Sequence, residues 1–278
     1  MLQAGTYYTL KIVKFVEFGA YLDADGTEVL LPKRYVPKKA EEGDEVEVFL
    51  YHDNEGRLIA TTDKALATVG EIALLEVADK NKQGAFLKWG IMKDVFLPLS
   101  QQRSRIYEGH YYLVYLYIDE MTGRVAATER FEKYLSNEQL TVKEKEEVSL
   151  LIWDKTDIGY KVIINNRHTG VLHFSDVFRD LEYGEKLKGF VKTIRPDDKI
   201  DVMMGERGYK RISNEAAHIL QLLKTNDNYL PYSDKSDPKA ISDFFGISKK
   251  AFKMAVGALY KQRLIELTQT GIKLVEEE

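Results

Sequence analysis

The chain of 278 residues contains no cysteine, only 6 prolines and no long run of apolar residues. Without cysteine it forms neither disulfides nor thiolate metal sites, which suits a reducing compartment. No segment approaches the roughly 20 apolar residues of a membrane-spanning helix. The first residues also lack the charged start and apolar core of a secretory signal. We therefore expect a cytoplasmic protein that makes no membrane contact.

Strong charge of either sign is lacking as well. The sequence has 40 Lys and Arg against 44 Asp and Glu, a net charge of −4 at pH 7. This balance argues against a protein that coats nucleic acid with its whole surface, so any such binding must come from local patches. Residues 1–64 are acidic, with 8 basic and 12 acidic residues, whereas residues 248–263 hold five basic residues and no acidic one. Basic charge is therefore concentrated near the C-terminal end.

Motifs for catalysis are missing. The 5 histidines are scattered, and His168 and His173, beside Asp176, lie in a strand-turn-strand context that disfavours metal ligation. No glycine-rich phosphate loop ending in Lys-Ser or Lys-Thr occurs, and the stretch GERGYKR at residues 205–211 is interpreted as an interdomain linker. The acidic residues show no spacing that would hold a pair of metal ions. The sequence predicts no catalytic residues, no metal and no cofactor.

An internal repeat is the clearest feature that the sequence does contain. The hexapeptides EFGAYL and KQGAFL place glycines at Gly19 and Gly84, and each is followed by an apolar run that ends in a proline, Pro32 or Pro98. Both copies finish in similar segments, GDEVEVFLYHDNEGRLIATT and GHYYLVYLYIDEMTGRVAAT. Matching anchors over about 60 residues indicate domains in tandem. Because glycine in a strand marks a bend or a close approach, we expect Gly19 and Gly84 to let a ligand come near.

A third, weaker copy starts near Val148. It carries Gly159, and its apolar run ends in His173 where the other copies have proline. Each copy contains about five short segments rich in Val, Ile, Tyr and Phe, separated by turn signals such as Asp25-Gly26. Five strands in about 65 residues favour a small barrel, because closure removes the exposed edges of an open sheet.

The C-terminal segment has helical rather than alternating periodicity. Asp237 is a predicted N-cap, Pro238 the first helical residue and Gly246 the terminator, and Ser248 caps a further helix. The apolar stripe of that helix comprises Phe252, Ala255, Val256 and Leu259. A predicted hairpin follows. Helices followed by a two-stranded hairpin are the order of a winged helix.

Each copy resembles an S1-type domain, an OB-fold barrel that binds single-stranded RNA. The resemblance lies in the start glycine, the FGAY motif, the VLLP or VLH closing the third strand, and the GDEVEV…RLIAT ending. Taken whole, the chain resembles the bacterial conserved virulence factor B family. This implies a mainly β multidomain fold of three tandem S1-type OB-fold barrels followed by an α+β winged-helix domain. The predicted boundaries are residues 1–64, 65–135, 145–210 (divergent) and 211–278.

The resemblance also implies which residues bind nucleic acid. Phe18 and Tyr21 match the two base-stacking positions of the family in the first copy. In the second copy Phe86 matches the second position, whereas Gln83 stands at the first, and Trp89 is a possible substitute for the missing ring. Stacking suits single strands because every base offers a π-face to an aromatic side chain.

The third copy has Ile158 and Lys161 at the stacking positions, which predicts weak stacking, but its His173 matches a contact of the family. Basic residues beside the first stacking pair and on the last long helix are candidates for phosphate contacts: Lys33, Arg34, Lys38, Lys249, Lys250 and Lys253. In the plainer interpretation, the aromatic residues are barrel core or exposed strand formers and the basic residues are merely solvated.

Three functions follow from these patterns. The leading hypothesis is a non-catalytic regulator that binds single-stranded RNA through the barrels, as the family resemblance implies. An alternative is a DNA-binding regulator whose winged helix reads duplex DNA while the barrels hold partners. The third is a protein-interaction scaffold in which the acidic first barrel has lost nucleic-acid binding.

Overall fold

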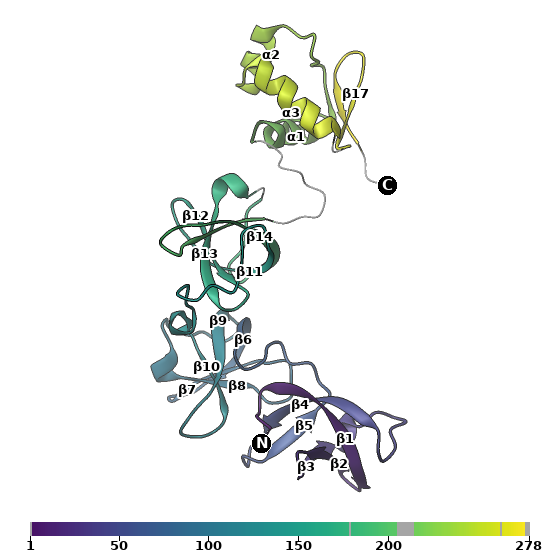
Figure 1. Ribbon diagram of the computed structural model, residues 1–278, viewed down its shortest axis with the longest axis vertical. Helices are drawn as coiled ribbons and strands as arrows, with labels where there is room; N and C mark the ends of the chain where they lie inside the picture. The colour runs from purple at the N-terminus through teal and green to yellow at the C-terminus, as the bar shows by residue number, and fades with distance from the viewer. Residues whose placement is uncertain (1, 178, 205–213, 262, 276–278) are drawn as a thin grey trace.

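The computed structural model describes residues 2–177, 179–204, 214–261 and 263–275, and the predicted linker at residues 205–211 lies outside them. Three closed five-stranded barrels follow one another along the chain, and a small three-stranded sheet with helices comes last (Figure 1). The predicted fold class is therefore confirmed.

The strands of each barrel correspond to the segments expected from the repeat. Barrel 1 contains β1 (Thr6–Val16), β2 (Gly19–Ala24), β3 (Thr27–Pro32), β4 (Glu45–His52) and β5 (Leu58–Thr61). Barrel 2 contains β6 (Ile72–Lys80), β7 (Gly84–Leu87), β8 (Val95–Pro98), β9 (Tyr111–Ile118) and β10 (Val125–Thr128). Barrel 3 contains β11 (Glu147–Lys155), β12 (Gly159–Ile164), β13 (His168–His173), β14 (Lys186–Ile194) and β15 (Ile200–Met204).

All three barrels have one topology. In each, the third strand pairs in parallel with the fifth, and the other pairings are antiparallel. The first strand of each barrel also shifts register near its end, where a bulge increases its bend. A single-turn 3-10 helix follows each third strand: η1 (Lys33–Tyr35), η2 (Leu99–Gln101) and η4 (Phe174–Asp176). The weakly matching third copy is thus a full structural repeat.

The repeated glycine has a packing function. Gly19 pairs with Pro32 across β2 and β3, and a Cβ at Gly19 would clash with the carbonyl oxygen of Leu31. Gly84 meets the carbonyl oxygen of Leu97 in the same way. Glycine is therefore required at these two positions because the backbone of the neighbouring strand approaches too closely for a side chain. Our expectation that these glycines admit a ligand is corrected accordingly.

Barrels 1 and 2 share a hydrophobic core. Phe49 of β4 is fully buried, and its ring lies 5.2 Å from that of Trp89 and 4.9 Å from that of Tyr7, both edge to face. The Tyr7 hydroxyl accepts a hydrogen bond from the backbone N–H of Ala65 at 2.7 Å. Because residues of both barrels belong to one buried cluster, the two barrels pack as one unit rather than as independent domains.

A second hydrophobic cluster joins barrels 2 and 3. Two hydrogen bonds flank it: Leu113 N–H donates to the Tyr183 hydroxyl and Ile72 N–H to the Asn166 side-chain oxygen, each at 3.2 Å. The buried members are Ile72, Leu113, Phe131, Leu151 and Ile163. Phe131 belongs to η3 (Phe131–Tyr134), which leads out of barrel 2. The contact fixes barrel 3 against its neighbour.

His168 attaches the connection between these barrels to barrel 3. The ring is buried; its Nδ1 lies 2.6 Å from the Ser136 carbonyl oxygen and its Nε2 accepts from the Thr141 N–H at 3.2 Å. Since Nε2 accepts, Nδ1 carries the proton and donates. This histidine therefore has a structural role. Among the described residues, no cluster of three or more His, Asp or Glu side chains is arranged to hold a metal ion.

The C-terminal domain contains the expected helices and hairpin, together with one short strand that the sequence does not predict and that pairs with the hairpin. In chain order the elements are α1 (Asn214–Thr225), β16 (Tyr229–Leu230), α2 (Pro238–Phe245), α3 (Lys249–Lys261), β17 (Ile265–Leu267) and β18 (Ile272–Leu274). The Asp237 carboxylate caps α2 by accepting from two backbone N–H groups, and Gly246 ends it in the left-handed conformation. Ser248 Oγ accepts from the Ala251 N–H and caps α3. The predicted stripe of α3 is buried in the core of the domain, together with residues of α1, α2 and the strands.

Candidate nucleic-acid interface

Barrel 1 presents two aromatic rings at the predicted stacking positions. Phe18, in the turn before β2, is 57% exposed, and Tyr21 on β2 is partly exposed. Their rings meet edge to face with centroids 6.3 Å apart. The Lys14 ammonium lies 5.0 Å from the Tyr21 ring centre and is paired with Glu28 at 2.7 Å. An exposed aromatic pair with a neighbouring cation has the composition of a stacking platform for single strands.

The basic residues of the loop beside this pair differ in their contacts. Lys33 and Lys38 are exposed to solvent. The Arg34 guanidinium lies 4.7 Å from the Tyr35 ring centre and donates to the sulfur of Met92 in barrel 2 at 2.9 Å. Lys33 and Lys38 therefore face solvent, whereas Arg34 is partly engaged in the junction between barrels.

Barrel 2 also has an aromatic pair, but its second ring comes from another strand. Phe86 on β7 lies opposite Phe96 on β8, with ring centroids 5.2 Å apart. The corresponding pair in barrel 1 is Tyr21 and Leu30. Sequence reasoning missed Phe96, although aligning the runs EVLLP and DVFLP would have revealed the extra ring.

Trp89 does not supply the missing ring. It is 3% exposed, and its indole N–H donates to the Ala67 carbonyl oxygen at 2.8 Å. Its ring packs against Phe49 in the core shared by barrels 1 and 2. Our prediction that Trp89 offers a stacking surface is therefore wrong, because a buried ring leaves no face for a base.

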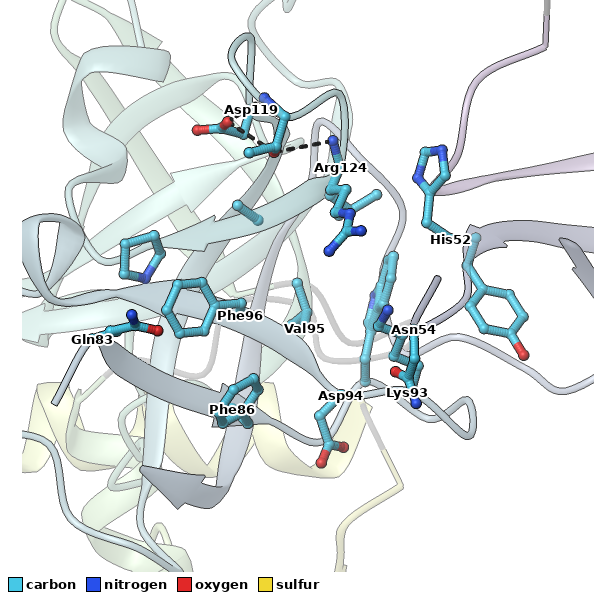
Figure 2. Close-up of a pocket in the computed structure, with 16 residues that line it drawn as sticks. His52, Asn54, Gln83, Phe86, Lys93, Asp94, Val95, Phe96, Asp119 and Arg124 are labelled. Carbon is cyan, nitrogen blue, oxygen red and sulfur yellow. Dashed lines mark hydrogen bonds between the residues drawn. The ribbon is translucent and has the colours of Figure 1, made fainter. Parts of the chain in front are cut away.

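A cleft of about 460 Å³ lies between the aromatic pair of barrel 2 and the β4–β5 turn of barrel 1. Figure 2 shows the Phe86 and Phe96 rings on one side and His52 and Asn54 on the other, with the Arg124 guanidinium pointing into the space between. The further lining residues are Tyr51, Gln83, Trp89, Lys93, Asp94, Val95, Pro98, Asp119, Thr122, Val125 and Ala126. The volume falls within the range of about 300–1,000 Å³ typical of small-molecule sites.

The turn between the last two strands contains an arginine in both barrels, but the two arginines have different partners. In barrel 1, Arg57 pairs with Asp53 of its own β4–β5 turn at 2.7 Å. In barrel 2, the Asp119 carboxylate instead accepts from the Thr122 N–H and hydroxyl, both at 2.9 Å. No ion pair to Arg124 occurs among the residues that the structure describes, and its side chain reaches into the cleft (Figure 2).

The cleft is lined by two cations, Lys93 and Arg124, and by His52. Lys93 donates to the Asp53 carbonyl oxygen at 2.6 Å, and burial, followed by the charge of Arg124, lowers its pKa. Burial and then the charges of Arg124 and Lys93 lower the pKa of His52, which favours a neutral imidazole. In the described part of the chain, the buried Nδ1 of His52 has no hydrogen-bond partner. Burial raises the pKa of Asp94, whose carboxylate points away from Arg124 (Figure 2).

Barrel 3 differs at the same two positions. Ile158 is 60% exposed and stands where barrel 1 has Phe18. Lys161, in place of Tyr21, pairs with Asp154 at 2.9 Å and lies 5.1 Å from the Trp153 ring centre. The cation covers the aromatic ring here, so a stacking pair like that of barrel 1 is not formed by these residues.

His173 belongs to a network of charged groups in barrel 3. Its Nε2 lies 2.9 Å from the Asp201 carboxylate, which also accepts two hydrogen bonds from Arg195 at 2.8 Å. Burial raises the pKa of Asp201, but the hydrogen bonds from Arg195 and His173 outweigh it and hold that pKa below its usual range. The imidazole is thus anchored on one side.

The basic residues of α3 project away from the core of the C-terminal domain. Lys250 and Lys253 are exposed. Lys249 is partly buried and donates to the Ser236 carbonyl oxygen at 2.8 Å, next to the start of α2. Lys249 therefore contributes to local structure, while Lys250 and Lys253 face solvent.

Within the described ranges, the longest apolar stretch of helix is too short for a membrane crossing.

Comparison with known protein families identifies both kinds of domain. The S1 domain matches residues 4–63 and 69–129, and the CvfB-like winged helix domain matches residues 217–274. A crystal structure of a multidomain protein with nucleic acid binding domains from Streptococcus pneumoniae aligns over 98% of both chains, with 23% identity and a TM-score of 0.44.

Two curated relatives align along most of the chain. The uncharacterized protein YitL of Bacillus subtilis is 28% identical over 274 residues, which cover 94% of this chain and 90% of the relative. Conserved virulence factor B of Staphylococcus aureus strain USA300 is 28% identical over 254 residues, covering 85% and 81%. With S1 barrels and a CvfB-like winged helix in the same chain, and relatives that match it nearly end to end, this protein belongs to the conserved virulence factor B family.

Proposed function

We propose that this protein is a non-catalytic regulator that binds single-stranded RNA through the aromatic faces of barrels 1 and 2. The observation that carries the proposal is the presence of partly exposed ring pairs on β2 and its preceding turn in barrel 1, and on β7 and β8 in barrel 2. Stacking tolerates any base, so such a protein binds many sequences. Its affinity depends on strand accessibility more than on base identity.

The barrels favour a single strand over a duplex. Bases in a duplex are already stacked on one another, and their faces are not available to Phe18 or Phe86. The acidic excess of residues 1–64 also weakens attachment to a densely charged duplex. Single strands expose base faces and carry less charge per unit length, which suits an aromatic surface with few cations.

One observation favours a second function. Lys250 and Lys253 are exposed on α3, which follows α2 as the recognition helix of a helix-turn-helix follows its first helix. Duplex DNA binding by the C-terminal domain would use these lysines for phosphate contacts.

A competition experiment separates these functions. Full-length protein is bound to fluorescein-labelled single-stranded RNA at low salt, and unlabelled single-stranded RNA or duplex DNA of equal charge is added. We expect RNA to displace the probe at much lower concentration than duplex DNA. Stronger displacement by the duplex would favour the DNA-binding function, and absence of binding to either nucleic acid would favour a protein-interaction scaffold.

A further inference from the structure

The cleft between barrels 1 and 2 combines three kinds of group that rarely meet by chance. An aromatic wall comes from Phe86 and Phe96, a cationic end from Lys93 and Arg124, and an opposing polar wall from the β4–β5 turn of barrel 1. In Figure 2 the two phenylalanine rings and the Arg124 guanidinium border one space, and Lys93 lies beside Asn54 on the side of barrel 1. A base needs a flat apolar surface, and its phosphate needs positive charge a short distance away.

The walls of the cleft are held in fixed positions. Phe49 and Trp89 are packed together in the core that barrels 1 and 2 share. Lys93 links the β7–β8 loop of barrel 2 to the Asp53 carbonyl oxygen of barrel 1. A site whose walls come from two rigidly joined barrels requires little ordering when a ligand binds.

Among the residues that the structure describes, neither cation of the cleft forms an ion pair, although the charge of Asp53 partly offsets that of Lys93. Asp53 and Asp119, the nearest turn acids, are committed to Arg57 and Thr122 respectively. Burial is the main cause of the lowered pKa of Lys93, and the positive charge of Arg124 lowers it further. An anion placed between them would relieve the repulsion between the two cations.

We propose that this cleft is a composite nucleotide site, in which Phe86 and Phe96 stack one base while Arg124 and Lys93 bind its phosphate. This inference rests on the proposed function and deepens it. His52 lies on the wall formed by barrel 1. Barrels 1 and 2 then bind a strand as one unit. The nucleotide is a residue of a strand or a free nucleotide, and the two sources are distinguished below.

Two substitutions test the two halves of the site. Phe96→Leu installs the residue type that barrel 1 carries at the corresponding position, Leu30, so the barrel is expected to fold. Arg124→Gln removes the cation. Arg130→Gln is the matched control, because Arg130 is an exposed arginine of the same barrel whose side chain bonds the Gln102 carbonyl oxygen outside the cleft. Thermal unfolding of each full-length variant verifies that the fold is intact.

The probes are a short fluorescein-labelled oligouridylate, uridine monophosphate and uridine. Phe96→Leu should weaken oligouridylate binding roughly five- to 150-fold, the equivalent of about 1–3 kcal/mol for one stacked base, with an unchanged salt slope. Arg124→Gln should lower the salt slope by about 0.7, because one phosphate contact is lost. Uridine monophosphate, followed by ligand-observed NMR, should be sensitive to both substitutions. Binding of uridine should be weakened by Phe96→Leu but not by Arg124→Gln. The control Arg130→Gln should leave the binding of all three probes unchanged.

The outcomes separate the two proposals. If Phe18→Ala weakens oligouridylate binding while neither cleft substitution changes any probe, the composite site is refuted and RNA binding stands. If the oligouridylate does not bind but uridine monophosphate binds with the expected sensitivities, the cleft accepts free nucleotides and the proposed RNA-binding function fails. If Arg124→Gln affects uridine as much as uridine monophosphate, the arginine does not contact the phosphate and the proposed arrangement is wrong.

Discussion

Barrels 1 and 3 have the same strand order, the same bulge and the same glycine packed against a carbonyl, yet their exposed faces differ. Barrel 1 presents Phe18 and Tyr21, whereas barrel 3 has Ile158 and a lysine that covers a tryptophan ring. Backbone geometry is therefore maintained by residues other than those that would contact a ligand. A fold can thus be repeated three times while the side chains on one face differ between the copies.

Barrel 2 lies between these extremes and shows how a face is rebuilt. Its first stacking position is Gln83, but a ring at Phe96 on the adjacent strand restores an aromatic pair. The neighbouring barrel then closes one side of that face and creates a cleft. The aromatic face of barrel 2 is thus one wall of a cleft that forms between two copies of the repeat.

The largest predicted effect concerns the junction that makes barrels 1 and 2 one unit. Phe49→Ala should lower the free energy of unfolding by about 3–5 kcal/mol, because it empties space in a core that both barrels share. Chemical denaturation of the full chain measures this loss. Phe18 is an exposed phenylalanine of the same barrel. The control variant Phe18→Ala should therefore change the free energy of unfolding by only about 0.5 kcal/mol. If Phe49→Ala and Phe18→Ala lowered the free energy of unfolding by equally small amounts, barrels 1 and 2 would be independent domains without a shared core.

The comparison between barrels 1 and 3 makes the next prediction. Phe18→Ala and Tyr21→Ala should each weaken binding of single-stranded RNA by about 1–3 kcal/mol, without a change in salt slope, because stacking rather than charge is lost. Ile158→Ala in barrel 3 is the matched substitution and should leave affinity unchanged. Fluorescence anisotropy at several salt concentrations gives both quantities. Wild-type affinity in the two barrel 1 variants would make those rings ordinary surface residues.

A smaller effect is expected from the basic helix of the C-terminal domain. Replacing Lys249, Lys250 and Lys253 by Gln should flatten the salt slope of binding by roughly two units and lower affinity for all sequences alike, since each phosphate contact contributes about 0.7–0.9. The Lys250 and Lys253 double variant spares the bond from Lys249 to Ser236 and controls for local structure. An unchanged slope with unchanged thermal stability would show that α3 does not contact nucleic acid.

The smallest effect concerns the charged network that replaces proline at the end of β13. Asp201→Asn should reduce stability at neutral pH by about 1 kcal/mol, because it weakens the bonds to His173 and Arg195. The pKa of Asp201 is lowered in the folded state, so its contribution is complete above the unfolded value of about 3.9 and is lost as pH falls through the lower folded value. Unfolding curves of wild type and variant should converge in acid. A gap that persists there would assign the loss to packing.

The sequence predicts the architecture well because its determinants are local. Gly19 and Pro32 have counterparts in the second copy, and the caps Asp237 and Ser248 lie beside the helices that they start. Such signals are readable without any long-range contact. The dipeptide Asp25-Gly26 likewise indicates the turn between two strands, and both residues have positive φ.

The candidate site is less predictable because it depends on contacts between copies. Nothing near Trp89 in the sequence indicates that Phe49 of another barrel will bury its ring. His52 and Arg124 come from different barrels and meet only after the shared core has formed. Phe96 was within reach of sequence comparison, since Leu30 occupies its place in the first copy.

Photocrosslinking tests the central claim, that barrels 1 and 2 bind a single strand through their aromatic faces, most directly. Full-length protein is irradiated with RNA that contains thiouridine, and the crosslinked peptides are identified by mass spectrometry. The account predicts crosslinks in the peptides that contain Phe18 and Tyr21 and in those that contain Phe86 and Phe96, with loss of the latter in Phe96→Leu. Crosslinks confined to barrel 3 or to α3 would contradict it.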